Sequence, residues 1–206
     1  MQKFKIGVIG CGSIAKKKYC PYYAKLEDVE LTSFCDINQE NAESLASLYG
    51  VSNAKIYVDY KDLISNDSLD IVFVLTPNST HAEITIASLE ANKHVICEKP
   101  MAITSADAYK MLSTAKKTGK KLTIGYQNRF RPDSQALHKA CEKGELGEIY
   151  FAKAHAVRRR AIPTWGYFID DKTQGGGPLI DIGSHALDLT LWMMNNYNVK
   201  SVVGSC

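Results

Sequence analysis

Six residues near the N-terminus, Gly-Cys-Gly-Ser-Ile-Ala at positions 10–15, have the spacing G-x-G-x-x-G/A. They follow an apolar segment, Phe4–Ile9, that we expect to be a strand, and they open an expected helix. The first glycine of such a turn permits a tight bend, the second lets a phosphate approach the backbone, and the small last residue allows close packing of helix on strand. The segment therefore predicts a pyrophosphate site at a helix N-terminus, where free N–H groups and the helix dipole favour an anion. The residues expected to contact it are Gly10, Gly12, Ser13, Ile14 and Ala15.

An acidic residue follows at the distance that dinucleotide binding requires. Asp36 comes directly after a second apolar segment, Val29–Cys35, close to the expected separation of about 20 residues from the glycine turn. A carboxylate there accepts hydrogen bonds from the adenosine ribose hydroxyls and repels a 2′-phosphate. We therefore expect NAD rather than NADP.

Two polar tripeptides follow later strands of the same pattern. They are Thr76-Pro77-Asn78 and Glu98-Lys99-Pro100. Open α/β sheets bind their ligands at the carboxyl ends of the strands, so both tripeptides are placed for binding. Two ordinary structural readings remain open, because Asn78 could cap a helix and Glu98 and Lys99 could form a plain ion pair.

The elements that must position these groups alternate between apolar strands and amphipathic helices. Such alternation predicts a doubly wound parallel sheet, covered on both faces by helices. The expected strands are Phe4–Ile9, Val29–Cys35, Ile56–Val58, Ile71–Leu75, His94–Cys97 and Leu122–Tyr126. The expected helices are Ser13–Lys18, Asn38–Tyr49, Tyr60–Ile64, Thr80–Ala91 and Ser105–Thr118.

The pattern changes near residue 124, beyond which all five arginines of the chain lie. We expect a Rossmann domain in residues 1–124 and part of a second, α+β domain in residues 125–206. Its expected sheet is mostly antiparallel, with strands at Glu148–Val157 and Asn198–Ser205, and its expected helices are Pro132–Lys143 and Leu179–Asn195.

Composition excludes several classes of protein. The 25 basic and 22 acidic side chains among 206 residues give a net charge of +3, which is too mild to indicate nucleic acid as a partner. No apolar run approaches the roughly 18 residues of a membrane span. The six cysteines show no C-x-x-C pair, so we expect reduced thiols in the cytoplasm and no metal site.

Several segments together resemble the signatures of one family, the Gfo/Idh/MocA oxidoreductases, relatives of glucose–fructose oxidoreductase and inositol dehydrogenase. These segments are Thr76–Asn78 with His81, His94–Ala102, Gly125–Pro132 and Gly175–Asp188. They occur in the family's order and, with the glycine turn, cover the chain from Phe4 onward.

The resemblance implies roles for matching positions. Lys99, Asp181 and His185 would form the catalytic centre, and Glu98 would bind the nicotinamide ribose. The implied cofactor contacts are Thr76, Pro77, Asn78, His81, Glu98, Lys99 and Asn128. A looser match implies that the segment with Arg158, Pro163 and Trp165 reaches the substrate.

These residue types suit the oxidation of a secondary alcohol, in which a hydroxyl proton is lost as a hydride leaves carbon. His185 is the best acid–base candidate, because its ordinary pKa is about 6.5. Lys99 can stabilise the developing alkoxide. Asp181 lies four residues before His185, so it could orient that ring or bind a neighbouring substrate hydroxyl. Asp188 either supports this centre or belongs to a polar patch.

We therefore expect an NAD-dependent dehydrogenase of a sugar, polyol or cyclic alcohol. An NAD-assisted glycosidase and a cofactor-binding regulatory protein remain alternatives. Family members continue past the equivalent of Cys206, so we expect this chain to be C-terminally truncated. An incomplete sheet leaves unpaired edges, and we expect association into a homo-oligomer through it.

Overall fold

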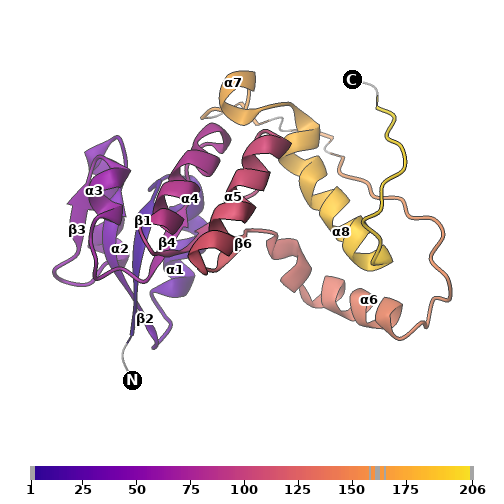
Figure 1. Ribbon diagram of the computed structural model, residues 1–206, viewed down its shortest axis with the longest axis horizontal. Coiled ribbons are helices and arrows are strands. Elements are labelled where there is room, and N and C mark those ends of the chain that lie inside the picture. The colour runs from indigo at the N-terminus through magenta and orange to yellow at the C-terminus, as the bar shows by residue number, and fades with distance from the viewer. Residues whose placement is uncertain (1–2, 158, 161–162, 165, 205–206) are drawn as a thin grey trace.

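A six-stranded parallel sheet forms the first part of the protein, seen in a computed structural model that describes residues 3–157, 159–160, 163–164 and 166–204 (Figure 1). Its strands are β1 (Phe4–Ile9), β2 (Val29–Cys35), β3 (Lys55–Tyr57), β4 (Ile71–Val74), β5 (His94–Cys97) and β6 (Leu122–Ile124). The spatial order is β3-β2-β1-β4-β5-β6, and every pairing is parallel. The order reverses between β1 and β4, which is where sheets of this kind leave a crevice for ligands.

Eight α-helices accompany the sheet in the described residues. They are α1 (Cys20–Tyr23), α2 (Gln39–Tyr49), α3 (Tyr60–Ile64), α4 (His81–Glu90), α5 (Ser105–Thr118), α6 (Pro132–Glu142), α7 (Asp171–Gln174) and α8 (Ser184–Met194). The predicted doubly wound α/β fold is thus confirmed, and the strand positions agree with those expected to within two residues.

Local chemistry sets several helix ends. The side chains of Asn38, Asp59 and Thr104 each accept a hydrogen bond from a backbone N–H in the first turn of the helix that follows. Such caps satisfy donors that the helix itself leaves unpaired. Gly119 ends α5 with a φ of +69°, in the left-handed region that glycine adopts without strain.

The sheet carries a separate apolar core on each face. On one face, Val72 and Val74 of β4 pack with side chains of α3, α4 and α5. On the other face, Phe73 of the same strand packs with Phe34 and with Leu45 of α2. Successive side chains of a strand point to opposite faces, so a strand that is apolar throughout contributes to both cores.

The second part of the chain differs from the expectation. Its described residues contain helices and irregular segments, and residues 148–157 and 198–204 form no strand; Ser205 lies outside the described residues. A strand needs a ladder partner for its backbone N–H and C=O groups, and neither segment pairs with another. The expected antiparallel sheet is therefore not seen in the described residues, and Figure 1 shows these segments as a long loop between α6 and α7 and as a tail after α8.

None of the described helices has both the length and the apolar character needed to cross a bilayer.

Substitutions at two leucines of α2 test how much the core contributes to the free energy of unfolding. Leu45 is 1% exposed and Leu48 is 55% exposed. Leu45→Ala should lower the free energy of unfolding by about 2–5 kcal/mol, because it removes buried methyl groups and leaves a cavity. Leu48→Ala should change it by less than about 0.5 kcal/mol. Urea unfolding followed by circular dichroism measures both, and equal effects would contradict this assignment of the core.

Candidate active site

The turn after β1 has the shape that the glycine pattern predicted. Gly10 has a φ of +90°, and a Cβ built there would lie 2.7 Å from the backbone carbon and oxygen of Leu75. Only glycine fits this position. A Cβ at Gly12 would meet no atom within 4 Å, so its backbone borders open space. The helix begins at Ser13, and its first N–H groups have no partner within the helix. This open cradle fits a pyrophosphate.

Asp36 lies beside this turn, at the carboxyl end of β2. Its Oδ2 accepts a hydrogen bond of 2.8 Å from the backbone N–H of Cys11, and its Oδ1 accepts one of 2.9 Å from the N–H of Asn38. The carboxylate therefore ties the glycine turn to the loop after β2. Sequence reasoning placed Asp36 at this edge, and the contact with Cys11 fixes its position next to Gly10 and Gly12.

A π-helical turn, Ala15–Tyr19, connects the glycine turn to the other half of the site. The hydroxyl of Tyr19 donates a hydrogen bond of 2.9 Å to Glu98 Oε1, and the N–H of Lys99 donates one of 3.0 Å to Oε2. Burial raises the pKa of Glu98, while these hydrogen bonds oppose the rise. Single π turns inside helices are frequent at functional sites.

Gly125 makes room for this contact. A Cβ there would lie 2.9 Å from the Tyr19 hydroxyl and 3.2 Å from Glu98 Oε1. Sequence reasoning missed Tyr19, since nothing in its local sequence distinguishes it from the tyrosines at 22 and 23. The pairing spans 79 residues and is visible only in the folded chain.

His81 joins the loops that follow β4 and β5. Its Nδ1 lies 2.8 Å from the carbonyl oxygen of Pro100, and its Nε2 lies 2.9 Å from that of Thr76. The side chain has no exposed surface, and this burial lowers its pKa. His81 was expected to line the cofactor; in this structure its ring is enclosed between the carbonyl oxygens of Thr76 and Pro100.

The glycine-rich segment of the second part docks on this same edge. The Asn78 side chain donates a hydrogen bond of 3.0 Å to the carbonyl oxygen of Gln174. At Gly175, with a φ of +81°, a Cβ would lie 2.5 Å from Cγ2 of Ile103. Asn78 therefore holds the α7 loop rather than capping α4. Pro77 directly precedes the turn Asn78–Thr80 that carries Asn78. Asn128 is half-buried in the turn after β6.

Lys99 meets Asp181 at this edge. The Lys99 Nζ donates a hydrogen bond of 2.8 Å to the backbone carbonyl of Asp181 and one of 3.1 Å to its Oδ1. Both side chains are largely buried, with 16% and 28% of their surfaces exposed. Of the two roles considered for Asp181, the structure shows neither directly; its carboxylate holds the lysine ammonium.

His185 lies in the first turn of α8, close to this pair. Its side chain is 8% exposed, and Nδ1 is buried without a hydrogen-bond partner among the described residues. The ring of Tyr126 contacts it edge to face, with centroids 6.2 Å apart. Burial lowers the pKa of His185, the Lys99 ammonium lowers it further, and Asp181 and Asp188 oppose both. The ring is thus held neutral near pH 7 and can accept a proton.

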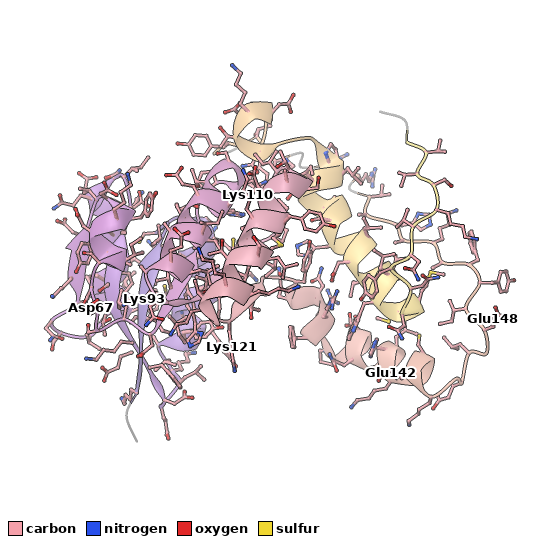
Figure 2. All side chains as sticks on the ribbon, in the orientation of Figure 1. Asp67, Lys93, Lys110, Lys121, Glu142 and Glu148 are labelled. Atoms are coloured by element: carbon pink, nitrogen blue, oxygen red, sulfur yellow. The ribbon has the colours of Figure 1, made fainter. Side chains whose placement is uncertain are left out.

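A second buried lysine lies elsewhere. Lys93, which precedes β5 and is 3% exposed, donates a hydrogen bond of 2.8 Å to the carbonyl of Asn66. It is at the amino end of the strands, and Figure 2 shows it near Asp67, away from α7 and α8.

The expected substrate residues Arg158 and Trp165 lie outside the described residues. Among those described, no three or more metal-ligating side chains gather into a possible metal site.

Comparison with known families matches both parts of the chain. Residues 4–126 match a family described as the oxidoreductase family, NAD-binding Rossmann fold. Residues 134–206 match the GFO/IDH/MocA C-terminal domain.

Curated relatives cover nearly all of this chain. The D-glucoside 3-dehydrogenase of Escherichia coli (strain K12) is 42% identical over 198 residues, which are 96% of this chain and 56% of that protein. The glucose-6-phosphate 3-dehydrogenase of Bacillus subtilis (strain 168) is 32% identical over 197 residues, 93% of this chain and 54% of that protein. The chain thus spans about half the length of the curated relatives that it matches.

Solved structures share the fold. The WlbA dehydrogenase from Bordetella pertussis, in complex with NADH and UDP-GlcNAcA, is 26% identical, with a TM-score of 0.85 over 93% of this chain and 55% of that one. The aldose-aldose oxidoreductase from Caulobacter crescentus, complexed with glycerol, is 28% identical, with a TM-score of 0.80 over 94% of this chain and 58% of that one.

Alanine substitutions at Gly10 and Gly12 should affect the free energy of unfolding and the binding of NADH differently. Gly12→Ala should change the free energy of unfolding by less than about 0.5–1 kcal/mol, the usual cost or gain of such a change. It should weaken NADH binding by at least about tenfold, about 1.4 kcal/mol, because its methyl group occupies the open cradle. Gly10→Ala should lower the free energy of unfolding by more than about 1–2 kcal/mol. Urea unfolding and NADH fluorescence titration measure these effects, and unchanged NADH affinity in Gly12→Ala would remove the pyrophosphate from this turn.

The positive charge of Lys99 should have a measurable effect on the pKa of His185. Lys99→Met removes a nearby positive charge and leaves the Asp181 carboxylate unpaired; both changes favour the imidazolium form, so the pKa of His185 should rise. NMR titration of the histidine ring signals measures it. Lys117→Met, the same substitution at an exposed position on α5, should leave the His185 pKa unchanged. A fall, or no change, in Lys99→Met would show that the two groups are not coupled.

Proposed function

This chain belongs to the Gfo/Idh/MocA family of oxidoreductases, and we propose that it transfers a hydride between a sugar or polyol hydroxyl and NAD. The observation that carries the proposal is the meeting of Lys99, Asp181 and His185 at the carboxyl edge of a Rossmann sheet. Lys99 and Asp181 are in direct contact there, and both charges act on His185. An ammonium and a neutral imidazole beside a dinucleotide turn are the groups that alcohol oxidation needs.

Each side chain then has a defined task. His185, held neutral by burial and by the nearby ammonium, accepts the proton of the substrate hydroxyl. Lys99 donates a hydrogen bond to the same oxygen and stabilises the negative charge that develops on it. Asp181 holds the Lys99 ammonium in place at 3.1 Å. The nicotinamide, when bound, supplies the hydride acceptor.

We propose a glucoside or related hexose as the substrate, oxidised at its C3 hydroxyl. Two of the curated relatives, in Escherichia coli and Bacillus subtilis, are named as 3-dehydrogenases of glucose derivatives. The first of these shares 42% of its aligned residues with this chain. An oxygen-rich substrate also suits an edge that gathers the side chains of Asn78, Asp181 and His185.

The proposal includes the organisation and setting of the chain. We place the boundary between the cofactor domain and the substrate domain near residue 124, where β6 ends.

We place the protein in the cytoplasm, in keeping with the free and buried thiols of Cys11, Cys20, Cys35 and Cys97. We propose a homo-oligomer formed through the exposed apolar side chains of the second part, which include Tyr150, Phe151, Val202 and Val203.

NAD reduction with a panel of glucosides, free hexoses and inositols tests the proposed function. Lys99→Met should lower kcat by about 10²–10³ and His185→Asn by about 10²–10⁴, with NAD binding retained. For oxidation, kcat/KM should fall as the pH drops through the lowered pKa of His185, since protonation removes the base. His185→Asn should lose this dependence.

The matched controls are Lys117→Met and His155→Asn, both at exposed positions. They should retain the activity of the original chain. Full turnover in Lys99→Met or His185→Asn, or tight NAD binding with no turnover of any alcohol in the panel, would contradict the proposed function.

A further inference from the structure

Arg129 and Asp188 form a partly buried ion pair, in which the Arg129 side chain is 31% exposed. The pair takes no direct part in the proposed chemistry. The guanidinium contacts both carboxylate oxygens, with Nε donating to Oδ2 at 2.8 Å and Nη2 donating to Oδ1. The Asp188 side chain is 8% exposed. The hydrogen bonds to Asp188 raise the pKa of Arg129. Two parallel bonds fix both the distance and the orientation of the partners, which a single lysine contact cannot do.

The pair connects the turn that follows β6 to α8, 59 residues further along the chain. Arg129 lies in the turn Gln127–Phe130, just after β6, whereas Asp188 lies on α8. The guanidinium also lies over the ring of Trp192, 5.4 Å from its centroid. His138 of α6 stacks on the same ring, with centroids 3.8 Å apart and planes 9° apart. Arg129 thus holds α8 through two side chains.

The held side chains share a helix face with the proposed base. His185, Asp188 and Trp192 are separated by three and four residues, the spacing that places side chains on one side of a helix. The pair therefore fixes the turn of α8 that carries His185. Positioning groups must hold a catalytic side chain to within about 0.5 Å of its productive place.

We infer that Arg129 and Asp188 are positioning residues, whose ion pair fixes the His185 ring against Tyr126 and beside Lys99. This inference rests on the proposed function and assigns a role to two residues that do not touch the reacting atoms. Arg129 also neutralises the Asp188 carboxylate, so that the negative charge next to His185 is compensated. The groups acting on the His185 ring are Lys99, Asp181, Asp188 and the ring of Tyr126.

Two substitutions should shift the pKa of His185 in opposite directions. In Arg129→Leu, Asp188 loses its compensating charge, so the pKa of His185 should rise. In Asp188→Asn, a negative charge that favours the imidazolium is removed, so the pKa of His185 should fall further. If the pair only stabilised the fold, both variants would loosen α8, expose the ring and shift the pKa upward. NMR titration of the His185 ring distinguishes the two cases.

Kinetics provide the second measurement. Arg129→Leu and Asp188→Asn should lower kcat by roughly 10- to 100-fold, as expected for a displacement of about 1 Å, with KM for NAD changed by less than about twofold. Arg129→Lys keeps the charge and loses the fork, so its kcat should lie between those of Arg129→Leu and the original chain. The nuclear Overhauser contact between Tyr126 and His185 should weaken in the same order.

A neighbouring ion pair is the matched control. Arg131 and Asp133 are 2.9 Å apart, with 62% and 67% of their side chains exposed. Exposed pairs contribute little, so Arg131→Leu should leave kcat, the His185 pKa and the Tyr126–His185 contact unchanged.

The inference is overturned if the His185 pKa shifts upward in both Arg129→Leu and Asp188→Asn, or if kcat is unchanged in both. If Arg129→Leu does not fold, Asp188→Asn and Arg129→Lys decide, because the first keeps the shape of the pair and the second keeps the positive charge. If the original chain oxidises no substrate, the proposed function fails. The NMR measurements on His185 then still decide the positioning role.

Discussion

The ion pair between Lys99 and Asp181 is the interaction on which the proposed site depends. It links the loop after β5 to the segment before α8, 82 residues apart. Because both side chains are largely buried, either charge alone would be costly to leave without its partner. The pair therefore fixes where the second part meets the sheet edge, and it brings a positive charge beside His185. The position and the protonation state of the proposed base both follow from it.

The sheet supplies the rigid frame for this contact. β4 contributes side chains to the cores on both faces, so the loop after it is held from both sides. Tyr19 then ties the glycine turn to Glu98, and His81 ties Thr76 to Pro100. Hydrogen bonds thus connect the start of the first helix, and the loop after β4, to the loop after β5.

The second part is organised differently. Between α6 and α7, and again after α8, the described chain is irregular (Figure 1). Many apolar side chains in these segments are exposed, such as Tyr150 and Val203. Arg129, Asp188 and Trp192 hold α8 against the junction, while segments expected to be strands lack partners. Order in this part comes from a few polar and aromatic contacts rather than from an enclosed core.

The sequence by itself determined the parallel sheet, the glycine turn and the place of Asp36, because each depends on local patterns of a few residues. It also predicted Lys99, Asp181 and His185 as site residues, through family signatures. Only the tertiary structure decided that Asp181 holds Lys99, that Tyr19 bonds Glu98, that His81 is enclosed and that residues 148–157 form no strand. These depend on contacts between segments far apart in the chain. Local spacing carries no information about which distant side chain completes a hydrogen bond, or whether a strand finds its neighbour.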